Sequence, residues 1–268
     1  MKVLDIYGKK DLDLITYNGK DIRKLMDEFF LKFPNEYRKN YDNNLDTLEV
    51  QRVDEMLDVN DSAEYYPIGN VMMFKSFAGI PHEMMHMASS DRVNNKSAFF
   101  REGIYSLYET GLVEGMTEYL SCIAKGGEPD AYFFEYFSIE MLSSIDGIFR
   151  PYFIPSYDDF VSLFPNKKNI CSLMYSLDYY HDGISKIDDN TSDRIISLIG
   201  DSVKSTIDSL IDIELSFDKS RHERKLYGDK FMDLISNMDL QMLVGDVCPD
   251  YLDYANHEIK KRILRRGK

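Results

Sequence analysis

Two of the five histidines in this chain stand four residues apart, with a glutamate between them, in the segment IPHEMMHMA (Ile80 to Ala88). Residues four apart on an α-helix share one face, so His82 and His86 can direct their imidazoles at one ion. Zinc binds imidazole nitrogen at about 2.0–2.1 Å. Glu83 is rotated away from the pair, where its carboxylate can take a proton from a water molecule beside the ion. The pattern therefore predicts a zinc site with a general base.

An ordinary amphipathic helix that carries two solvated histidines is the alternative interpretation. The neighbours of the pair, Met84, Met85, Met87 and Ala88, are apolar, which predicts a helix buried on most of its sides. Histidines without partners would be costly in such surroundings, so this context favours a ligand role for both rings.

A catalytic zinc site takes three protein ligands and leaves one position for water. A third histidine does not follow at short range, since positions 89 and 92 are Ser89 and Arg92. The next candidates are Glu114 and Glu118, one helical turn apart in GLVEGMTEYL (Gly111 to Leu120). Glu114 can supply the third ligand, and Glu118 can accept the distal N–H of a ligating histidine. The alternative is a solvated helix face, although like charges at this spacing repel and do not serve helix stability.

HEMMH followed by GLVEGMTEYL resembles the gluzincins, the thermolysin-like zinc metallopeptidases with an HExxH helix and a glutamate ligand on a following helix. In that group the glutamate stands in an N-E-x-x-[ST]-[DE] string, and residues 113 to 118 read VEGMTE here. The resemblance implies that Glu114 is the ligand and Glu118 the supporting acid. Val113 departs from the pattern, because an asparagine is common at its position. The resemblance covers residues 70 to about 126.

Together with the helical period of the later chain, the resemblance implies an α+β, mostly helical, zincin-like fold, in which a small mixed sheet and the HExxH helix precede a helical C-terminal half. It implies a hydrolase that cleaves peptide or protein substrates with zinc as cofactor. The strand NVMMFKSF (Asn70 to Phe77) would be the edge with which a substrate pairs, and the helical half would be the far wall of the cleft. In this family a tyrosine or histidine stabilises the oxyanion. The candidates are Tyr105, Tyr108, Tyr179, Tyr180 and His181.

A protein that binds zinc without turnover is the second functional hypothesis: a zincin-fold sensor or a module that binds a peptide or protein. Glu83 favours catalysis over this alternative, because a structural zinc site needs no base between its histidines. A cytosolic regulatory peptidase that cleaves a repressor is disfavoured, because its usual alanine- and asparagine-rich ligand segment is missing.

Two early segments, residues 19–33 and 45–59, carry apolar residues at helical spacing. Short strands are expected in KVLDIY and LDLITY, and AFFREGIYSLYETG (residues 98–111) is typical of two strands or a hairpin. A helix is expected from about Leu112 to Ala124, with a stop at Gly126 and Gly127.

Almost all of the chain after Pro129 shows a period of 3.6 residues. We therefore expect a mixed α/β subdomain over residues 1–127, which carries the zinc-binding helices, and a helical subdomain over residues 128–268.

The net charge of −14 argues against a nucleic-acid partner. One basic cluster, EIKKRILRRGK (Glu258 to Lys268), is best interpreted as the solvated end of a final helix. Three distant cysteines form no CxxC pair, which predicts reduced and mostly buried thiols. Neither a signal peptide nor an apolar run long enough to span a bilayer is visible, so we expect a cytoplasmic protein without a membrane partner. The sequence carries no signal for oligomeric state.

Overall fold

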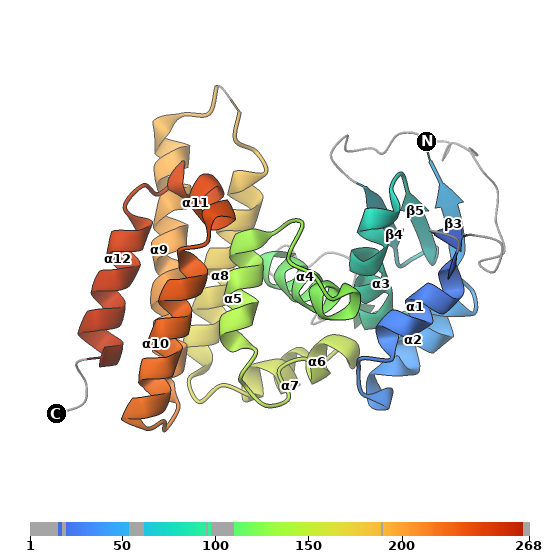
Figure 1. Ribbon diagram of the computed structural model, residues 1–268, viewed down its shortest axis with the longest axis horizontal. Coiled ribbons are helices and arrows are strands. Elements are labelled where there is room, and N and C mark those ends of the chain that lie inside the picture. The colour runs from blue at the N-terminus through green and yellow to red at the C-terminus, as the bar shows by residue number, and fades with distance from the viewer. Residues whose placement is uncertain are drawn as a thin grey trace. The chain divides into compact units, whose positions relative to one another are not determined.

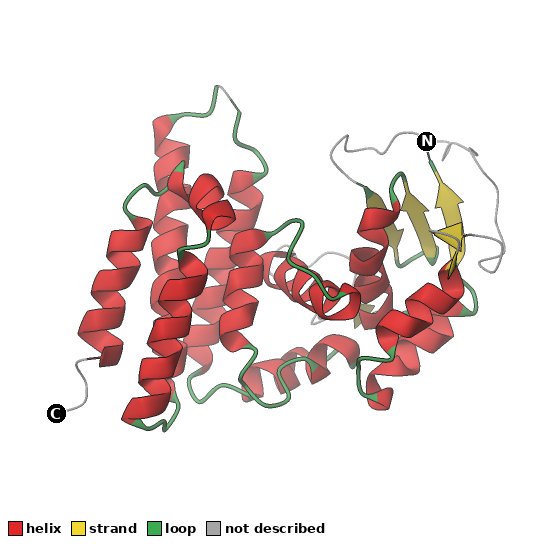
Figure 2. Cartoon of the chain, viewed as in Figure 1, coloured by secondary structure: helices red, strands yellow, loops and turns green. Residues whose placement is uncertain are grey.

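The structure is a computed structural model that describes residues 16–17, 20–53, 62–94, 96–97, 110–188 and 190–264. The chain divides into two compact units: residues 1–105, 117–128 and 149–156 form the first, and residues 106–116, 129–148 and 157–268 form the second. Helix α4 (Thr110–Lys125) runs unbroken through the division between residues 116 and 117. The described residues are mostly helical with a small mixed sheet, which confirms the α+β class (Figure 2).

The sheet of the first unit has three strands, β3 (Glu49–Arg52), β4 (Ala63–Tyr66) and β5 (Val71–Phe74), in the order β3-β5-β4. Strand β3 pairs with β5 in parallel, and β4 pairs with β5 antiparallel. Met72 and Phe74 are buried while the residues beside them are half-buried, as expected for a strand with one face on the core. Two short pairs, β1 (Thr16–Tyr17) with β2 (Lys20–Asp21) and β6 (Ser90–Asp91) with β7 (Lys96–Ser97), complete the described strands.

Strand β5 confirms the strand expected within Asn70–Phe77, but its expected place at the sheet edge is wrong. Both of its sides are already hydrogen-bonded, one to β3 and the other to β4. A short 3-10 turn, η3 (Phe77–Gly79), then leads directly into α3 (Ile80–Ser89), the helix of the two histidines.

The helical spacing in residues 45–59 is also overturned, because residues 49–52 form β3. Leu48 and Val50 are buried and alternate with more exposed Glu49 and Gln51, a period of two. A few apolar residues can satisfy both periods, and the pairing with β5 decides between them. Residues 54–61, most of the hairpin expected in residues 98–111, and KVLDIY lie outside the described residues.

Aromatic packing holds the remaining helices of the first unit together. These helices are α1 (Ile22–Phe30), η2 (Asn35–Tyr37), α2 (Arg38–Leu45) and α6 (Arg150–Phe153). The Phe30 ring stacks on Tyr41 with centroids 4.2 Å apart, and Phe153 meets Phe30 edge-on at 5.7 Å. Helix α1 confirms the helix expected in residues 19–33.

Every regular element that the structure describes in the second unit after Pro129 is a helix, as the periodicity predicted (Figure 1). Its long helices α8 and α9 lie side by side. The bounds are α5 (Phe133–Leu142), α7 (Tyr157–Ser162), α8 (Lys167–Ile184), α9 (Asp193–Ser216), α10 (Arg221–Ile235), α11 (Met238–Gly245), α12 (Tyr251–Glu258) and the π-helical segment η4 (Ile259–Leu264). Within the described ranges, no helix is both long and apolar enough to cross a membrane.

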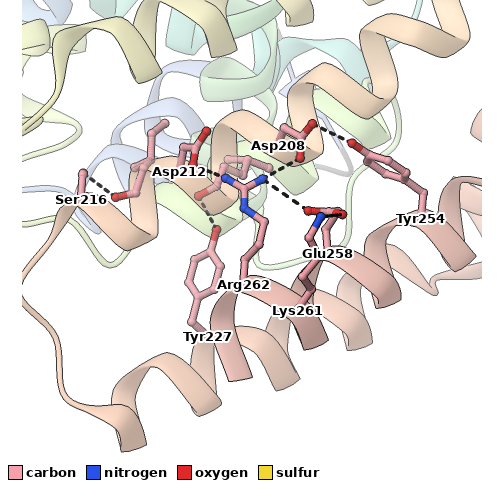
Figure 3. A network of polar contacts seen from close by, with 10 residues as sticks. Asp208, Asp212, Ser216, Tyr227, Tyr254, Glu258, Lys261 and Arg262 are labelled. Atoms are coloured by element: carbon pink, nitrogen blue, oxygen red, sulfur yellow. Dashed lines mark hydrogen bonds and ion pairs between the residues drawn. The ribbon is translucent and has the colours of Figure 1, made fainter. Parts of the chain in front are cut away.

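Arg262 in η4 is not the solvated cation that the basic cluster suggested. Its Nη1 lies 2.7 Å from Oδ1 of Asp208, and its Nη2 pairs with Asp212 of the same helix, α9 (Figure 3). The Tyr254 hydroxyl donates to the other oxygen of Asp208 at 2.7 Å. Part of the basic cluster therefore fastens the C-terminal segment to α9.

Candidate metal centre

Helix α3 begins at Ile80 with Pro81 in its first turn, where the missing N–H of proline costs no hydrogen bond. Met84, Met85 and Met87 are completely buried, so this short helix is enclosed on most of its sides as expected. The histidine rings are only half-buried, and they occupy the remaining face of the helix.

The two imidazoles approach each other through the same ring atom. Nε2 of His82 lies 3.2 Å from Nε2 of His86. Two nitrogens bound at the usual distance to one tetrahedral zinc ion are about 3.3 Å apart. The spacing of the rings is therefore that of two ligands of a single ion.

Glu114 of α4 completes a group of three side chains. Ligand atoms of His82, His86 and Glu114 all lie within 4.8 Å of one another, and the group could hold a metal ion. All three residues are half-buried. The structure thus brings together the three residues that the sequence predicted as ligands.

Glu118, one turn after Glu114 on α4, bonds to the first histidine. Its Oε2 lies 2.9 Å from Nδ1 of His82, and its side chain is almost fully buried. The Cys122 thiol donates to Oε1 at 3.7 Å, and the Lys125 ammonium lies 3.7 Å from the same oxygen. An ionised carboxylate only accepts, so the neutral ring that donates to it carries its proton on Nδ1 and keeps its lone pair on Nε2.

Glu83 is buried, at 9% exposure, and a strand of the sheet holds its carboxylate in place. The backbone N–H of Tyr65 in β4 donates to Oε2 of Glu83 at 2.8 Å. The Tyr65 hydroxyl donates to Oδ1 of Asn70 at 2.8 Å, which fixes the strand in turn. Asn70 has a φ of 52°, a left-handed conformation that asparagine tolerates better than most residues. The base candidate is therefore oriented by a strand contact that the sequence did not indicate.

A buried asparagine of α2 ties down the C-terminal end of α3. The Asn44 amide donates to the carbonyls of Met87 at 2.8 Å and Ser90 at 2.7 Å. The hydroxyls of Ser89 and Ser90 both donate to the carbonyl of His86 at 2.9 Å. These bonds satisfy carbonyls that a helix end leaves without intrahelical partners. No local pattern in the sequence distinguished Asn44, which lies in the polar segment NYDNNLD (residues 40–46).

Two glycines of α4 allow other helices of the second unit to approach its first half. A Cβ atom on Gly111 would stand 2.6 Å from the carbonyl oxygen of Leu177 in α8. A Cβ atom on Gly115 would stand 2.7 Å from the carbonyl oxygen of Glu135 in α5. Backbone on both sides therefore contacts the turn that carries Glu114.

His181 of α8 is the most suitable of the oxyanion candidates among the described residues. Its Nδ1 lies 3.0 Å from Oε1 of the buried Glu135. Burial opposes the charged ring, but the hydrogen bond and charge of Glu135, followed by the charges of Glu114 and Asp182, raise the pKa of His181 above its ordinary value. His181 thus lies within electrostatic reach of the candidate ligand Glu114.

The tyrosine candidates are less suitable. Tyr180 is 2% exposed, packs against Phe134 with ring centroids 4.6 Å apart, and has a pKa raised by burial. Tyr179 is 41% exposed and neighbours the exposed Tyr175 on the same helix. Tyr105 and Tyr108 lie outside the described residues.

Comparison with known proteins gives no relative: no family model, no curated protein and no solved structure matches this chain. The nature of the ligand atoms therefore bears on the identity of the ion. Two imidazole nitrogens and one carboxylate oxygen form a set that zinc accepts in catalytic sites, where a fourth position takes water.

Proposed function

We propose that this chain is a zinc-dependent metallopeptidase of the gluzincin type, with His82, His86 and Glu114 as ligands and Glu83 as general base. The observation that carries the proposal is the convergence of the three ligand side chains within 4.8 Å. The contact of Glu118 with Nδ1 of His82 supports it, because ligating histidines donate their distal N–H to such partners.

Zinc, when bound, lowers the pKa of its water toward neutrality and polarises the carbonyl of the substrate. Glu83 accepts one proton from the attacking water as oxygen bonds to the carbonyl carbon. The same carboxyl then gives that proton to the amide nitrogen as the C–N bond breaks, which yields a carboxylic acid and an amine. The Tyr65 N–H supports this role, because it holds one carboxylate oxygen of Glu83 in a fixed direction.

We propose His181 as the donor to the developing oxyanion. Its bond to Glu135 orients the ring, and Nε2 makes no hydrogen bond to other residues in the part of the chain that the structure describes. The raised pKa favours the protonated ring, which is the better donor to negative charge.

A peptide substrate would pair with β4 and not with β5. Strand β5 is occupied on both sides, whereas β4 stands last in the strand order and contacts Glu83 through Tyr65. Pairing along β4 would bring a peptide beside the base through main-chain hydrogen bonds, without a requirement for one sequence.

The test compares wild-type protein with Glu83→Gln, which retains the shape of the side chain but not its basicity. Elemental analysis measures bound zinc, and a peptide library measures cleavage. We expect equal zinc in both proteins and a loss of cleavage of about 10²- to 10⁴-fold in the variant. Glu214→Gln is the matched control, because Glu214 is also a buried glutamate but lies in α9.

Cleavage by Glu83→Gln at the wild-type rate would overturn the assignment of the base. A wild-type protein that binds no zinc would overturn the proposal as a whole. Zinc binding without cleavage by either protein would favour the sensor or binding module instead.

A further inference from the structure

Asp178 is a buried acid that the proposed reaction does not use. It lies in α8 and is 6% exposed. Its Oδ1 accepts the backbone N–H of Gly111 at 2.9 Å, while its Oδ2 is buried and has no hydrogen-bond partner among the described residues. A half-satisfied buried carboxyl is costly, so its presence calls for a compensating role.

The pKa of Asp178 reflects the cost of burying its charge. Burial raises the pKa of Asp178 to about 7, even though the Gly111 N–H acts in the opposite direction. The charge of Asp182 raises the pKa further and that of His181 lowers it. Near neutral pH, burial therefore disfavours the ionised form of Asp178.

The N–H that Asp178 accepts lies at the start of the ligand helix. Gly111 is the second residue of α4, and its N–H belongs to the first turn, where donors lack intrahelical acceptors. Glu114 follows three residues later on the same face of the helix. A bond that fixes Gly111 consequently fixes the turn that carries the carboxylate ligand.

Close backbone contact strengthens this connection. A Cβ atom on Gly111 would stand 2.6 Å from the carbonyl oxygen of Leu177, the residue before Asp178. The backbones of α8 and of the first turn of α4 are therefore packed too closely to shift past each other.

We propose that Asp178 is a positioning residue for the metal centre: by accepting the Gly111 N–H it sets the first turn of α4, and with it Glu114, where an ion can be bound. The inference rests on the proposed zinc site but not on peptide cleavage. It assigns Asp178 no contact with the ion or with substrate.

The experiment measures zinc affinity by competition with a chelator and the visible absorption of the Co²⁺-loaded protein, which reports ligand geometry. The variants are Asp178→Ala, Asp178→Asn and, as the matched control, Ser176→Ala. Ser176 is a buried residue of the same helix whose hydroxyl accepts a hydrogen bond from Thr206 of α9. Circular dichroism of the metal-free proteins establishes that each variant is folded.

Asp178→Ala should bind zinc about 10- to 100-fold more weakly and change the Co²⁺ spectrum, as expected when a group that orients a metal ligand is lost. Asp178→Asn keeps an oxygen acceptor and should restore the wild-type spectrum and most of the affinity. Ser176→Ala should lower thermal stability and leave zinc affinity unchanged.

Wild-type zinc affinity and a wild-type Co²⁺ spectrum in Asp178→Ala would overturn the proposal. If that variant does not fold, a loss of zinc affinity of about 10- to 100-fold in Asp178→Asn, which keeps the oxygen acceptor, would overturn it as well. A wild-type protein that binds zinc but cleaves no peptide would refute the peptidase and leave the role of Asp178 measurable.

Discussion

Nδ1 of His82 lies 2.9 Å from Oε2 of Glu118, and both belong to the first unit of the chain. The contact assigns the imidazole proton to Nδ1, because the carboxylate only accepts. It therefore directs the lone pair of Nε2 toward His86, whose own Nε2 is 3.2 Å away. Glu118 therefore sets which nitrogen of His82 can bind an ion, although Glu118 itself need not contact the ion.

Glu118→Ala should consequently weaken zinc binding by about 10- to 100-fold, because the His82 ring loses its fixed tautomer and orientation. Competition with a chelator measures the affinity. Glu128→Ala, an exposed change just beyond α4, serves as the control and should bind zinc normally. Equal affinities in the two variants would show that Glu118 does not orient His82.

Zinc should raise the thermal stability of the wild-type protein, because an ion that binds only the folded chain stabilises it by mass action. The gain is about 2.7 kcal/mol when free zinc is 100 times the dissociation constant. His86→Ala should lose this gain, since one of three ligands is missing. His257→Ala is the matched control, because the His257 side chain is 68% exposed. Thermal unfolding with zinc and with a chelator gives the measurement, and an undiminished gain in His86→Ala would contradict the ligand assignment.

The candidate ligands could be predicted from the sequence because each pair among them and their neighbours is local. Helical periodicity alone places His82 beside His86 and Glu114 beside Glu118. The contact of Glu118 with a histidine of the pair was predicted too. The other supporting contacts could not be predicted, because they join residues far apart in the chain that no motif links. Asn44 with Met87 is an example, as is the Tyr65 N–H with Glu83.

The error over residues 45–59 has the same physical origin. Leu45, Leu48 and Val53 fit a helical stripe, yet Leu48 and Val53 are buried at the two ends of a short strand. The strand forms because Glu49–Arg52 pairs with Val71–Phe74, a partner that no local pattern reveals. The same pairing places β5 in the middle of the sheet, so β4, and not β5, is an edge strand.

Gly115→Ala should lower the free energy of unfolding by about 1–3 kcal/mol, the usual range for an overpacked site. The new Cβ would stand 2.7 Å from the carbonyl oxygen of Glu135, and this neighbour is backbone that can yield only if α5 moves. Urea unfolding measures the change. Gly245→Ala in α11 is the control, because its Cβ would meet nothing within 4 Å. Equal stability of Gly115→Ala and wild type would show that α4 and α5 are not held this closely.

Asp178→Asn should alter the pH dependence of stability in the metal-free protein. The pKa of Asp178 is about 7 in the folded chain, because burial disfavours its charge. In the unfolded chain the pKa is about 3.9. Folding therefore takes up a proton between these two values, and this contribution to wild-type stability is lost as the pH rises from about 4 to about 7.

The asparagine of the Asp178→Asn variant does not titrate, so its stability lacks this pH-dependent contribution. The free energy of unfolding of Asp178→Asn relative to wild type should therefore grow by about 4 kcal/mol between about pH 4 and pH 8. Urea unfolding across this range measures the difference, in which the titration of unrelated acids cancels. Asp182→Asn, one turn further along α8 and exposed, should show a much smaller change. A difference between Asp178→Asn and wild type that does not vary with pH would mean that Asp178 is ionised in the folded chain as readily as in water.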